Sequence, residues 1–251
     1  MPVDPWQPEN LAIIAAIFLL AGAVKGVVGL GLPTVSLGLL TVVFGLKGAM
    51  VLMIIPSFTT NFWQGVVGGN LVKLLKRFWL LFALTCICIW IGAKFLKTAD
   101  TAMLSVLLGF VTFLYGLIGL VAPRMPDARP HEKWLSPLVG ISNGLITGLT
   151  GSSVMPGVPY YQSLEMDRDE MIQAMGILFS ISALALGFAM AGEGLLPTEL
   201  GVASLAGLVP AFGGMWLGLQ VRKRISQQTF KRFLFASLLA LGAYIMVRAI
   251  L

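Results

Sequence analysis

The stretch AGAVKGVVGLGLP, residues 21–33, lies between two apolar runs and combines regularly spaced glycines with a proline. Three of these glycines follow the spacing GxxxGxxG, which recurs 122 residues later in GLITGLTGSSVMPGVP, residues 144–159. The aligned glycines are Gly22 with Gly144, Gly26 with Gly148, and Gly29 with Gly151. A motif repeated at a constant offset predicts an internal duplication of the chain.

Two further pairs of short matches keep the same order along the sequence. Ala49-Met50 recurs as Ala174-Met175 at an offset of 125, and Trp90-x-Gly92 recurs as Trp216-x-Gly218 at an offset of 126. Because the offset drifts by only a few residues, the matches predict two collinear halves.

A polar, proline-containing stretch at residues 123–134 separates the two halves. It is the only linker of any length, and it holds the sole histidine, His131, which we expect to be solvated. Clusters of polar residues and proline between apolar runs indicate loops. We therefore expect a first repeat over residues 1–122, the linker over 123–134 and a second repeat over 135–251.

Composition places most of the chain in a lipid bilayer. Hydrophobic residues make up 57% of its 251 residues and charged residues only 11%, whereas soluble domains carry about 25% charge. The apolar residues gather in runs near the roughly 20 residues that a helix needs to cross the hydrocarbon. The runs are 10–32, 34–46, 48–68, 77–97, 100–122, 135–151, 153–164, 171–191, 199–221 and 228–250. They predict an all-α polytopic membrane protein with about 8–10 transmembrane segments.

Two of these runs, 34–46 and 153–164, are short. Each follows a glycine-rich stretch, and Pro33, Pro156 and Pro159 lie in or beside them. Proline interrupts a helix, and non-helical backbone is tolerated within a membrane only where protein or a water-filled cavity surrounds it. The sequence therefore predicts broken or re-entrant helices at both places.

The basic residues are divided unevenly between the two sides of the predicted bundle. The loops after odd-numbered runs hold twelve, namely Lys73, Lys76, Arg77, Arg124, Arg129, Lys133, Arg168, Arg222, Lys223, Arg224, Lys231 and Arg232. The opposite side holds Lys47, Lys94, Lys97 and Arg248. An excess of Lys and Arg marks the cytoplasmic side, so we expect both termini to be periplasmic. Five runs in each half would also make the halves inverted repeats. If two runs form a re-entrant pair instead of spanning the membrane, the sides assigned to the later loops do not change. If a single run does not span the membrane, this assignment is reversed.

Each glycine stretch has two interpretations. Glycine lets helices approach closely and so serves helix packing in membranes. Several glycines followed by a proline can also end one helix and begin another. The backbone amides at the start of the second helix then have no partner in the helix and can bind an anion. The sequence leaves both interpretations open.

Polar side chains gather around both glycine stretches. A single Ser or Thr in a membrane helix usually bonds to its own backbone, but two groups at matching places of two repeats predict a polar cavity. The candidate substrate-binding residues are Lys25, Gly29, Gly31, Thr34, Ser57, Thr60, Asn61, Gln64, Asn143, Thr147, Thr150, Gly151, Ser152, Ser153 and Ser180.

Lys25 is the only ionisable side chain placed well inside an apolar run. An intramembrane charge is costly and indicates function, although a lysine near a helix end can also snorkel to the membrane surface. The Asp and Glu residues all fall in loops or at the ends of runs. Because carboxylates are the usual ligands of hard cations, this distribution favours an anionic substrate. It also argues against hydrolytic chemistry in the membrane. We expect no enzymatic activity, no metal and no cofactor.

These features resemble the sulfite exporter TauE/SafE family, also called the 4-toluene sulfonate uptake permease family. The residues that carry the resemblance are the two glycine motifs, the first extended to Gly31, and the pairs Trp90-x-Gly92 and Trp216-x-Gly218. The resemblance covers almost the whole chain. The sequence departs from the family's glycine runs at Leu30, Leu32, Ser152 and Ser153, which leaves the substrate open.

The resemblance implies a multi-pass transporter of the bacterial inner membrane, driven by an ion gradient. Its substrate would be a small anion, such as sulfite, an organosulfonate or a related sulfur-containing compound. We expect an exporter that works by alternating access, with a proton or sodium ion for coupling, the lipid bilayer around it, no nucleic acid partner, and a homodimer as one assembly open to it. The alternatives are an anion channel of the same architecture, an uptake permease for a carboxylate-type anion, and a membrane-embedded enzyme or assembly factor.

Overall fold

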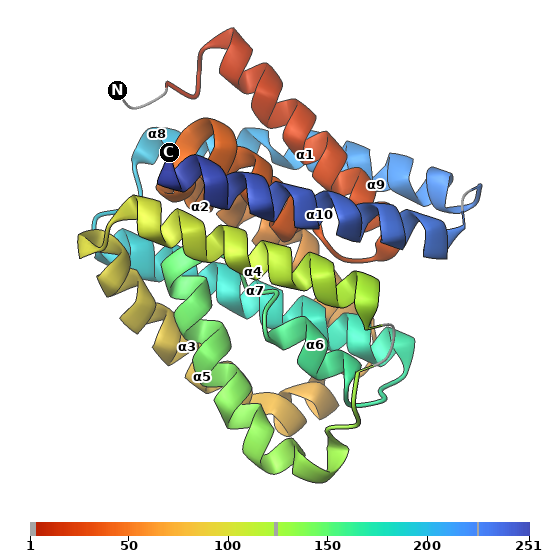
Figure 1. The fold of residues 1–251 in the computed structure, drawn as a ribbon. Coiled ribbons are helices and arrows are strands. Elements are labelled where there is room, and N and C mark those ends of the chain that lie inside the picture. The colour runs from red at the N-terminus through yellow and green to blue at the C-terminus, as the bar shows by residue number, and fades with distance from the viewer. Residues whose placement is uncertain (1–3, 123–124, 225) are drawn as a thin grey trace.

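The computed structural model describes residues 4–122, 125–224 and 226–251. Within these ranges every regular element is a helix, and the helices form one bundle (Figure 1). They are α1 (Pro8–Val28), α2 (Leu32–Val67), α3 (Leu71–Thr98), α4 (Thr101–Val121), the 3-10 turn η1 (Arg129–His131), α5 (Glu132–Thr150), α6 (Gly157–Gln162), α7 (Arg168–Gly192), α8 (Thr198–Ala206), α9 (Leu208–Arg222) and α10 (Gln227–Ile250).

Large apolar side chains lie on the outside of the bundle as well as in its core, and several polar side chains are buried. Met103, Val209 and Phe233 are 72%, 79% and 74% exposed, whereas Lys25 and Asn143 are 3% and 0% exposed. Large apolar side chains on the outside are expected where the surroundings are lipid. Seven spans of the described residues are long and apolar enough to cross a membrane, with α8 and α9 counted together. The prediction of an all-α polytopic membrane protein is confirmed.

The chain breaks at both glycine stretches. α1 ends at Gly29, whose φ is 89°, and α2 begins after Gly31, whose φ is 108°. α5 ends in the same way at Gly151, whose φ is 79°. Glycine reaches this left-handed region at little cost, and it ends helices by turning the chain away from the axis. The third glycine of each motif is therefore the point where a helix stops.

Both short runs of the sequence form short helices. α2 is interrupted at Gly45, with φ 70° and ψ 168°, so residues 32–44 form a short helix ahead of a longer one. In the second half the short helix is α6, which has six residues and follows the break at Gly151.

The first two glycines of the first motif serve the close packing of α1 along α9. A Cβ atom placed on Gly22 would collide with the carbonyl oxygen of Ala211. One placed on Gly26 would lie 2.9 Å from the Cα of Gly218. Only glycine permits two helix backbones to approach so closely.

The second motif packs α5 along α3 by the same means. A Cβ atom on Gly144 would lie 2.5 Å from the carbonyl oxygen of Thr85, and one on Gly148 would lie 2.8 Å from the Cα of Gly92. Residue numbers rise together along α1 and α9 and along α5 and α3, so both pairs are parallel. Gly218 and Gly92 are the glycines of the two aligned Trp-x-Gly motifs. Each half thus supplies the motif glycine against which the other half packs.

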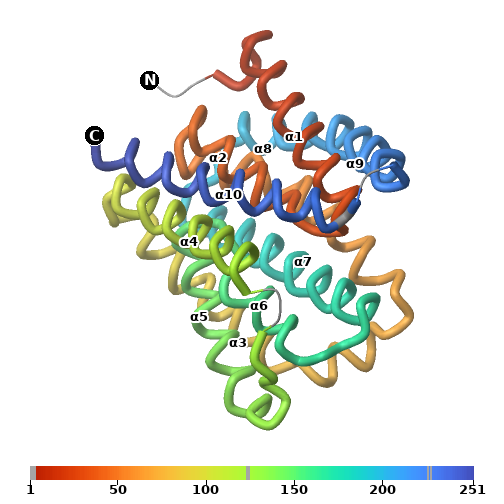
Figure 2. Tube along the Cα trace, turned by 45° about the vertical axis from the view of Figure 1, so that its right-hand side comes forward, coloured from red at the N-terminus to blue at the C-terminus, as the bar shows by residue number. Residues whose placement is uncertain are grey.

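Two more helix pairs, α2 with α7 and α4 with α10, are antiparallel. A Cβ atom on Gly176 would lie 2.7 Å from the amide nitrogen of Gly65, and one on Gly109 would lie 2.8 Å from the carbonyl oxygen of Gly242. Figures 1 and 2 show α4 and α10 side by side along one face of the bundle. α2 and α7 carry the aligned Ala-Met matches, so this pair joins corresponding helices of the two halves.

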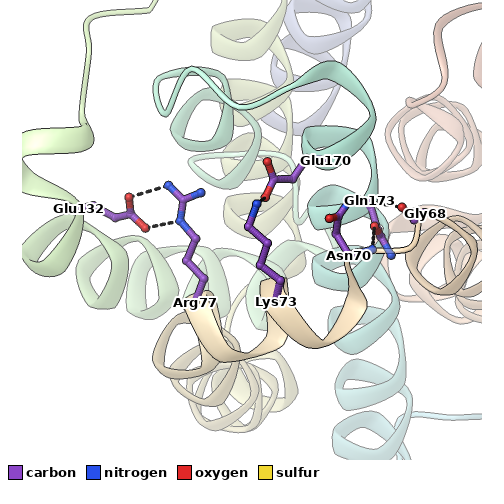
Figure 3. A network of polar contacts seen from close by, with 7 residues as sticks. All are labelled: Gly68, Asn70, Lys73, Arg77, Glu132, Glu170 and Gln173. Carbon is purple, nitrogen blue, oxygen red and sulfur yellow. Dashed lines mark hydrogen bonds and ion pairs between the residues drawn. The ribbon is translucent and has the colours of Figure 1, made fainter.

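Most basic residues lie at one end of the bundle. In Figure 1 the connections after α4, α6 and α9 lie at the right, and those after α3 and α7 lie at the left. At the basic end two ion pairs link α3 to the second half (Figure 3). The Lys73 ammonium lies 2.8 Å from the Glu170 carboxylate of α7, and Arg77 donates two hydrogen bonds of 2.7 Å to Glu132 of α5.

Gln173, which is buried in α7, braces the turn between α2 and α3 at the same end (Figure 3). Its side-chain nitrogen donates to the Gly65 carbonyl at 2.8 Å, and its side-chain oxygen accepts from the Asn70 amide at 2.9 Å. One amide side chain thereby satisfies two backbone groups that flank the turn.

Replacing Gln173 by leucine should destabilise the protein by about 2 kcal/mol, because it removes the partners of two backbone groups at a part-buried place. The nearby Glu132→Gln should cost less, about 1 kcal/mol at most, because its ion pair is partly exposed and keeps one hydrogen bond. Thermal unfolding in detergent measures both. A larger loss for Glu132→Gln would contradict this ranking.

Candidate functional site

A small cavity lined by buried residues, which we call the central cavity, lies between the two helix breaks. Pro33 of the first break and Gly151 of the second lie on its wall, together with apolar side chains of α2 and α7. Its polar lining consists of four hydroxyl side chains: Ser57, Thr147, Ser153 and Ser182. Its free volume is about 10 Å³, room for about one water molecule. No Asp or Glu is among the lining residues.

The hydroxyl groups of the second half are held by the break itself. Thr147 donates a 2.6 Å hydrogen bond to the carbonyl oxygen of Asn143, one turn earlier in α5, and its oxygen lies 3.2 Å from that of Ser153. The Asn143 side-chain oxygen accepts a 3.3 Å hydrogen bond from the Gly157 amide at the start of α6. The hydroxyls of Thr147 and Ser153 therefore line the cavity from a backbone that these hydrogen bonds hold in place.

Several polar groups near the cavity are buried without a hydrogen-bond partner among the described residues. They are the hydroxyls of Ser182 and Thr34 and the side-chain nitrogen of Asn143. Leaving such a group unpaired costs about 1–3 kcal/mol, so these atoms are free to bond a ligand that enters. Thr34 lies in the first turn of α2, where the amides of Leu32 and Thr34 have no acceptor within the helix.

Lys25 lies in the last turn of α1 and points into the protein. Its amino group contacts the Thr60 hydroxyl at 3.3 Å and donates a hydrogen bond to the side-chain oxygen of Asn61. The Asn61 amide donates in turn to the Ser57 carbonyl at 2.8 Å and lies 3.4 Å from the Ser57 hydroxyl. Because Ser57 lines the cavity, this chain of contacts connects Lys25 to it. At 3% exposure Lys25 does not reach the membrane surface by snorkelling.

The other candidate residues lie around the cavity rather than on its wall. Ser180 donates to its own helix backbone at Gly176, and Thr150 does so at Ile146. Gln64 donates to the Ile172 carbonyl of α7 at 2.8 Å, which braces α2 against α7. Ser152 donates its backbone amide to the Thr150 hydroxyl and is buried, but it is not a lining residue. Gly29 and Gly31 contribute the backbone of the first break.

Ser182 was absent from the candidate residues, although the repeat contains a signal for it. The offset of 125 that aligns Ala49-Met50 with Ala174-Met175 also aligns Ser57 with Ser182, and both line the cavity. The offset of 122 that aligns the glycine motifs places Thr147 opposite Lys25. One pair of lining hydroxyls, Ser57 and Ser182, is thus matched between the halves, whereas the lysine belongs to the first half alone.

A larger cavity of about 670 Å³ opens at the basic end of the bundle. Val28 and Leu30, which flank Gly29 at the first break, line its inner part, and Lys231 and Arg232 of α10 lie at its wall. It forms a vestibule that leads from the basic end to the first break.

Among the described residues, no group of three or more His, Cys, Asp or Glu side chains is arranged to hold a metal ion. The site therefore offers hydroxyls, helix amides and one amino group, and these groups suit an oxyanion.

Comparison with known proteins places the chain in a family. The sequence model described as Sulfite exporter TauE/SafE matches residues 14–245, from within α1 to within α10. No match was found among the curated proteins or among the solved structures. The matched region contains both breaks, the central cavity and both Trp-x-Gly motifs, and it covers nearly all of the chain. This chain therefore belongs to the sulfite exporter TauE/SafE family of membrane transporters.

Proposed function

We propose that this protein is a secondary transporter of a small sulfur-containing oxyanion, such as sulfite or an organosulfonate, which it holds in the central cavity. The observation that carries this proposal is a cavity between two helix breaks that has four hydroxyl groups and no carboxylate on its wall. Hydroxyl and amide donors stabilise an anion, whereas a cation in the same place would lack negative ligands. Family membership supports the sulfur-containing substrate class.

The two halves act in this proposal as inverted repeats. Its support is the reciprocal packing, with α1 along α9 and α5 along α3 in parallel, and α2 with α7 and α4 with α10 antiparallel. In this proposal a twofold axis in the membrane plane would exchange α2 with α7 and α4 with α10, and it would exchange the pair of α1 and α9 with the pair of α5 and α3. Transporters with such repeats bind substrate at the repeat interface near the middle of the bilayer, and the proposal is supported by a cavity that residues of both breaks line.

The size of the central cavity and the position of the vestibule support alternating access. The central cavity is smaller than any oxyanion, so it must expand to accept one, while the vestibule gives access from the basic end. We assign the basic end to the cytoplasm because of its excess of Lys and Arg. This orientation places both termini in the periplasm of a bacterial inner membrane, with export of the anion as the direction. A closed centre of this kind favours a carrier over a channel.

Purified protein in liposomes should take up or release labelled sulfite, thiosulfate, taurine or sulfoacetate with a rate that saturates as the anion concentration rises. Empty liposomes and liposomes that contain an unrelated membrane protein provide the background. If none of these compounds crosses the membrane, the proposed substrate class is wrong. Unitary currents in a planar bilayer would instead indicate an anion channel.

A further inference from the structure

The environment of Lys25 distinguishes it from every other basic residue that the structure describes. It is almost fully buried, and its two polar partners, Thr60 and Asn61, are both neutral. The ion pairs among the described residues join Lys73, Arg77, Lys97 and Arg129 to carboxylates, and none includes Lys25. A buried ammonium without a counter-ion costs several kcal/mol. The site therefore lacks the negative charge that a protonated Lys25 requires.

No neighbouring helix supplies that charge. α1 packs against α2, α9 and α10. Their charged and titratable side chains are Lys47 on α2, Arg222 on α9, and Lys231, Arg232, Tyr244 and Arg248 on α10. None of them is a carboxylate, and the one acid of α1, Glu9, lies at the opposite end of that helix. α7 also meets the end of α1, through Ile172 beside Gly29, but its Asp169 is exposed and its Glu170 pairs with Lys73. Glu165, which lines the vestibule, is exposed and pairs with Arg129. A negative charge beside Lys25 must come from the substrate.

From this we infer that Lys25 carries a proton together with the anion, so that the protein is an anion–proton symporter with one proton per cycle. The inference rests on the proposed function. In the empty site Lys25 is a neutral amine. When an anion enters, the amine takes one proton from the compartment to which the site is open, and the resulting ammonium pairs with the anion. On the other side the anion leaves, and the amine returns the proton to water.

The repeat sets the stoichiometry at one. The residue aligned with Lys25 in the second half is Thr147, and a hydroxyl does not change its charge in this pH range. The residues aligned with Thr60 and Asn61 at the offset of 125 are Ala185 and Leu186, which are apolar. A monoanion and one proton together carry no net charge, so the membrane potential does not oppose their joint export, which follows the outward concentration gradient of the anion. Sodium is disfavoured as the coupling ion because the site has no carboxylate to bind it.

Binding of ethanesulfonate to the purified protein tests the inference, because this anion keeps a single negative charge across the pH range of the assay. Linkage requires proton uptake and anion binding to favour each other equally. We expect the Kd of the wild-type protein to rise about tenfold per pH unit where the free amine is neutral. Calorimetry in buffers of different ionisation enthalpy should report uptake of one proton per anion bound.

Variants assign the proton to Lys25. Lys25→Arg keeps a fixed charge, so its Kd should be independent of pH and no proton should be taken up. Lys25→Met should weaken binding about tenfold to a hundredfold, by loss of a charged hydrogen bond, without proton uptake. Lys94→Met removes an exposed lysine of α3 and should behave as the wild type. Thermal unfolding shows which variants are folded. If Lys25→Arg does not fold, the result for Lys25→Met tests whether Lys25 carries the proton.

The outcomes separate the inference from the proposed function. Wild-type binding that is independent of pH would overturn proton coupling and leave anion transport intact. Proton uptake that persists in folded Lys25→Arg or Lys25→Met would show that another group carries the proton. If neither sulfite nor ethanesulfonate binds at any pH, the proposed function fails, and this inference fails with it.

Discussion

Replacing Gly214 by alanine should lower the midpoint of thermal unfolding by about 10 °C, whereas the same change at Gly213 should leave it unchanged or raise it slightly. The two glycines are neighbours in α9 but face different surroundings. A Cβ atom on Gly214 would collide with the Leu19 carbonyl of α1 and lie 2.9 Å from the Ala23 amide nitrogen. A Cβ atom on Gly213 would meet only a flexible leucine methyl at 3.9 Å.

The size of the stability loss in Gly214→Ala depends on which atoms must shift to make room for the new Cβ atom. Overpacking costs about 1–3 kcal/mol, and here the obstacle is backbone of the partner helix, so we expect the upper end. A loss of about 3 kcal/mol lowers the midpoint by about 6–12 °C for a chain of this size. Alanine at Gly213 gains up to about 1 kcal/mol of helix propensity. Fluorescence-detected size exclusion after heating measures both variants, and equal midpoints would show that α1 and α9 are not in backbone contact.

Removing the aligned hydroxyls, as Ser57→Ala together with Ser182→Ala, should weaken anion binding at least a hundredfold while the protein stays folded. Each hydroxyl would bond a charged ligand, and such a bond contributes about 1.5–3 kcal/mol, a factor of about ten or more apiece. Folding should be preserved because the Ser182 hydroxyl has no partner to lose, and Ser57 has one weak contact at 3.4 Å.

The matched control is Ser142→Ala together with Ser180→Ala. Both hydroxyls donate to their own helix backbone, at Leu138 and Gly176, and neither lines the cavity. This variant should bind sulfite like the wild type. Equal losses in the two double variants, or no loss in either, would mean that the anion binds somewhere other than the central cavity.

The sequence was informative about helix ends and about the halves. Glycine at Gly29 and Gly151, followed by proline, predicted both breaks because few other residues adopt a positive φ at a helix end. The order of the matches predicted two collinear halves, and the polar composition of residues 123–134 predicted the linker between them. These features depend on local backbone conformation or on repetition, and both can be read along the chain.

The rotational position of the buried helices could not be read in this way. Ser180 and Ser182 are two residues apart, so they point to nearly opposite sides of α7, and only one faces the cavity. In a soluble helix a polar stripe would indicate which side faces water. α7 is apolar nearly all round, so that indicator is missing, and the sequence alone does not show which of Ser180 and Ser182 faces the cavity. Likewise, the distinction between glycines that pack and glycines that end a helix depended on the partner helix, which lies far away in sequence.

The pairing of α1 with α9 has a consequence for biosynthesis. The two helices are separated by about 190 residues, and ribosomes add roughly 5–20 residues per second. During the resulting interval of roughly 10–40 s, α1 is already made but its partner is not. Its glycine face and Lys25 must then be shielded by lipid headgroups, by the insertion machinery or by a transient neighbour. The close packing of α1 against α9 can therefore form only after most of the chain has been synthesised.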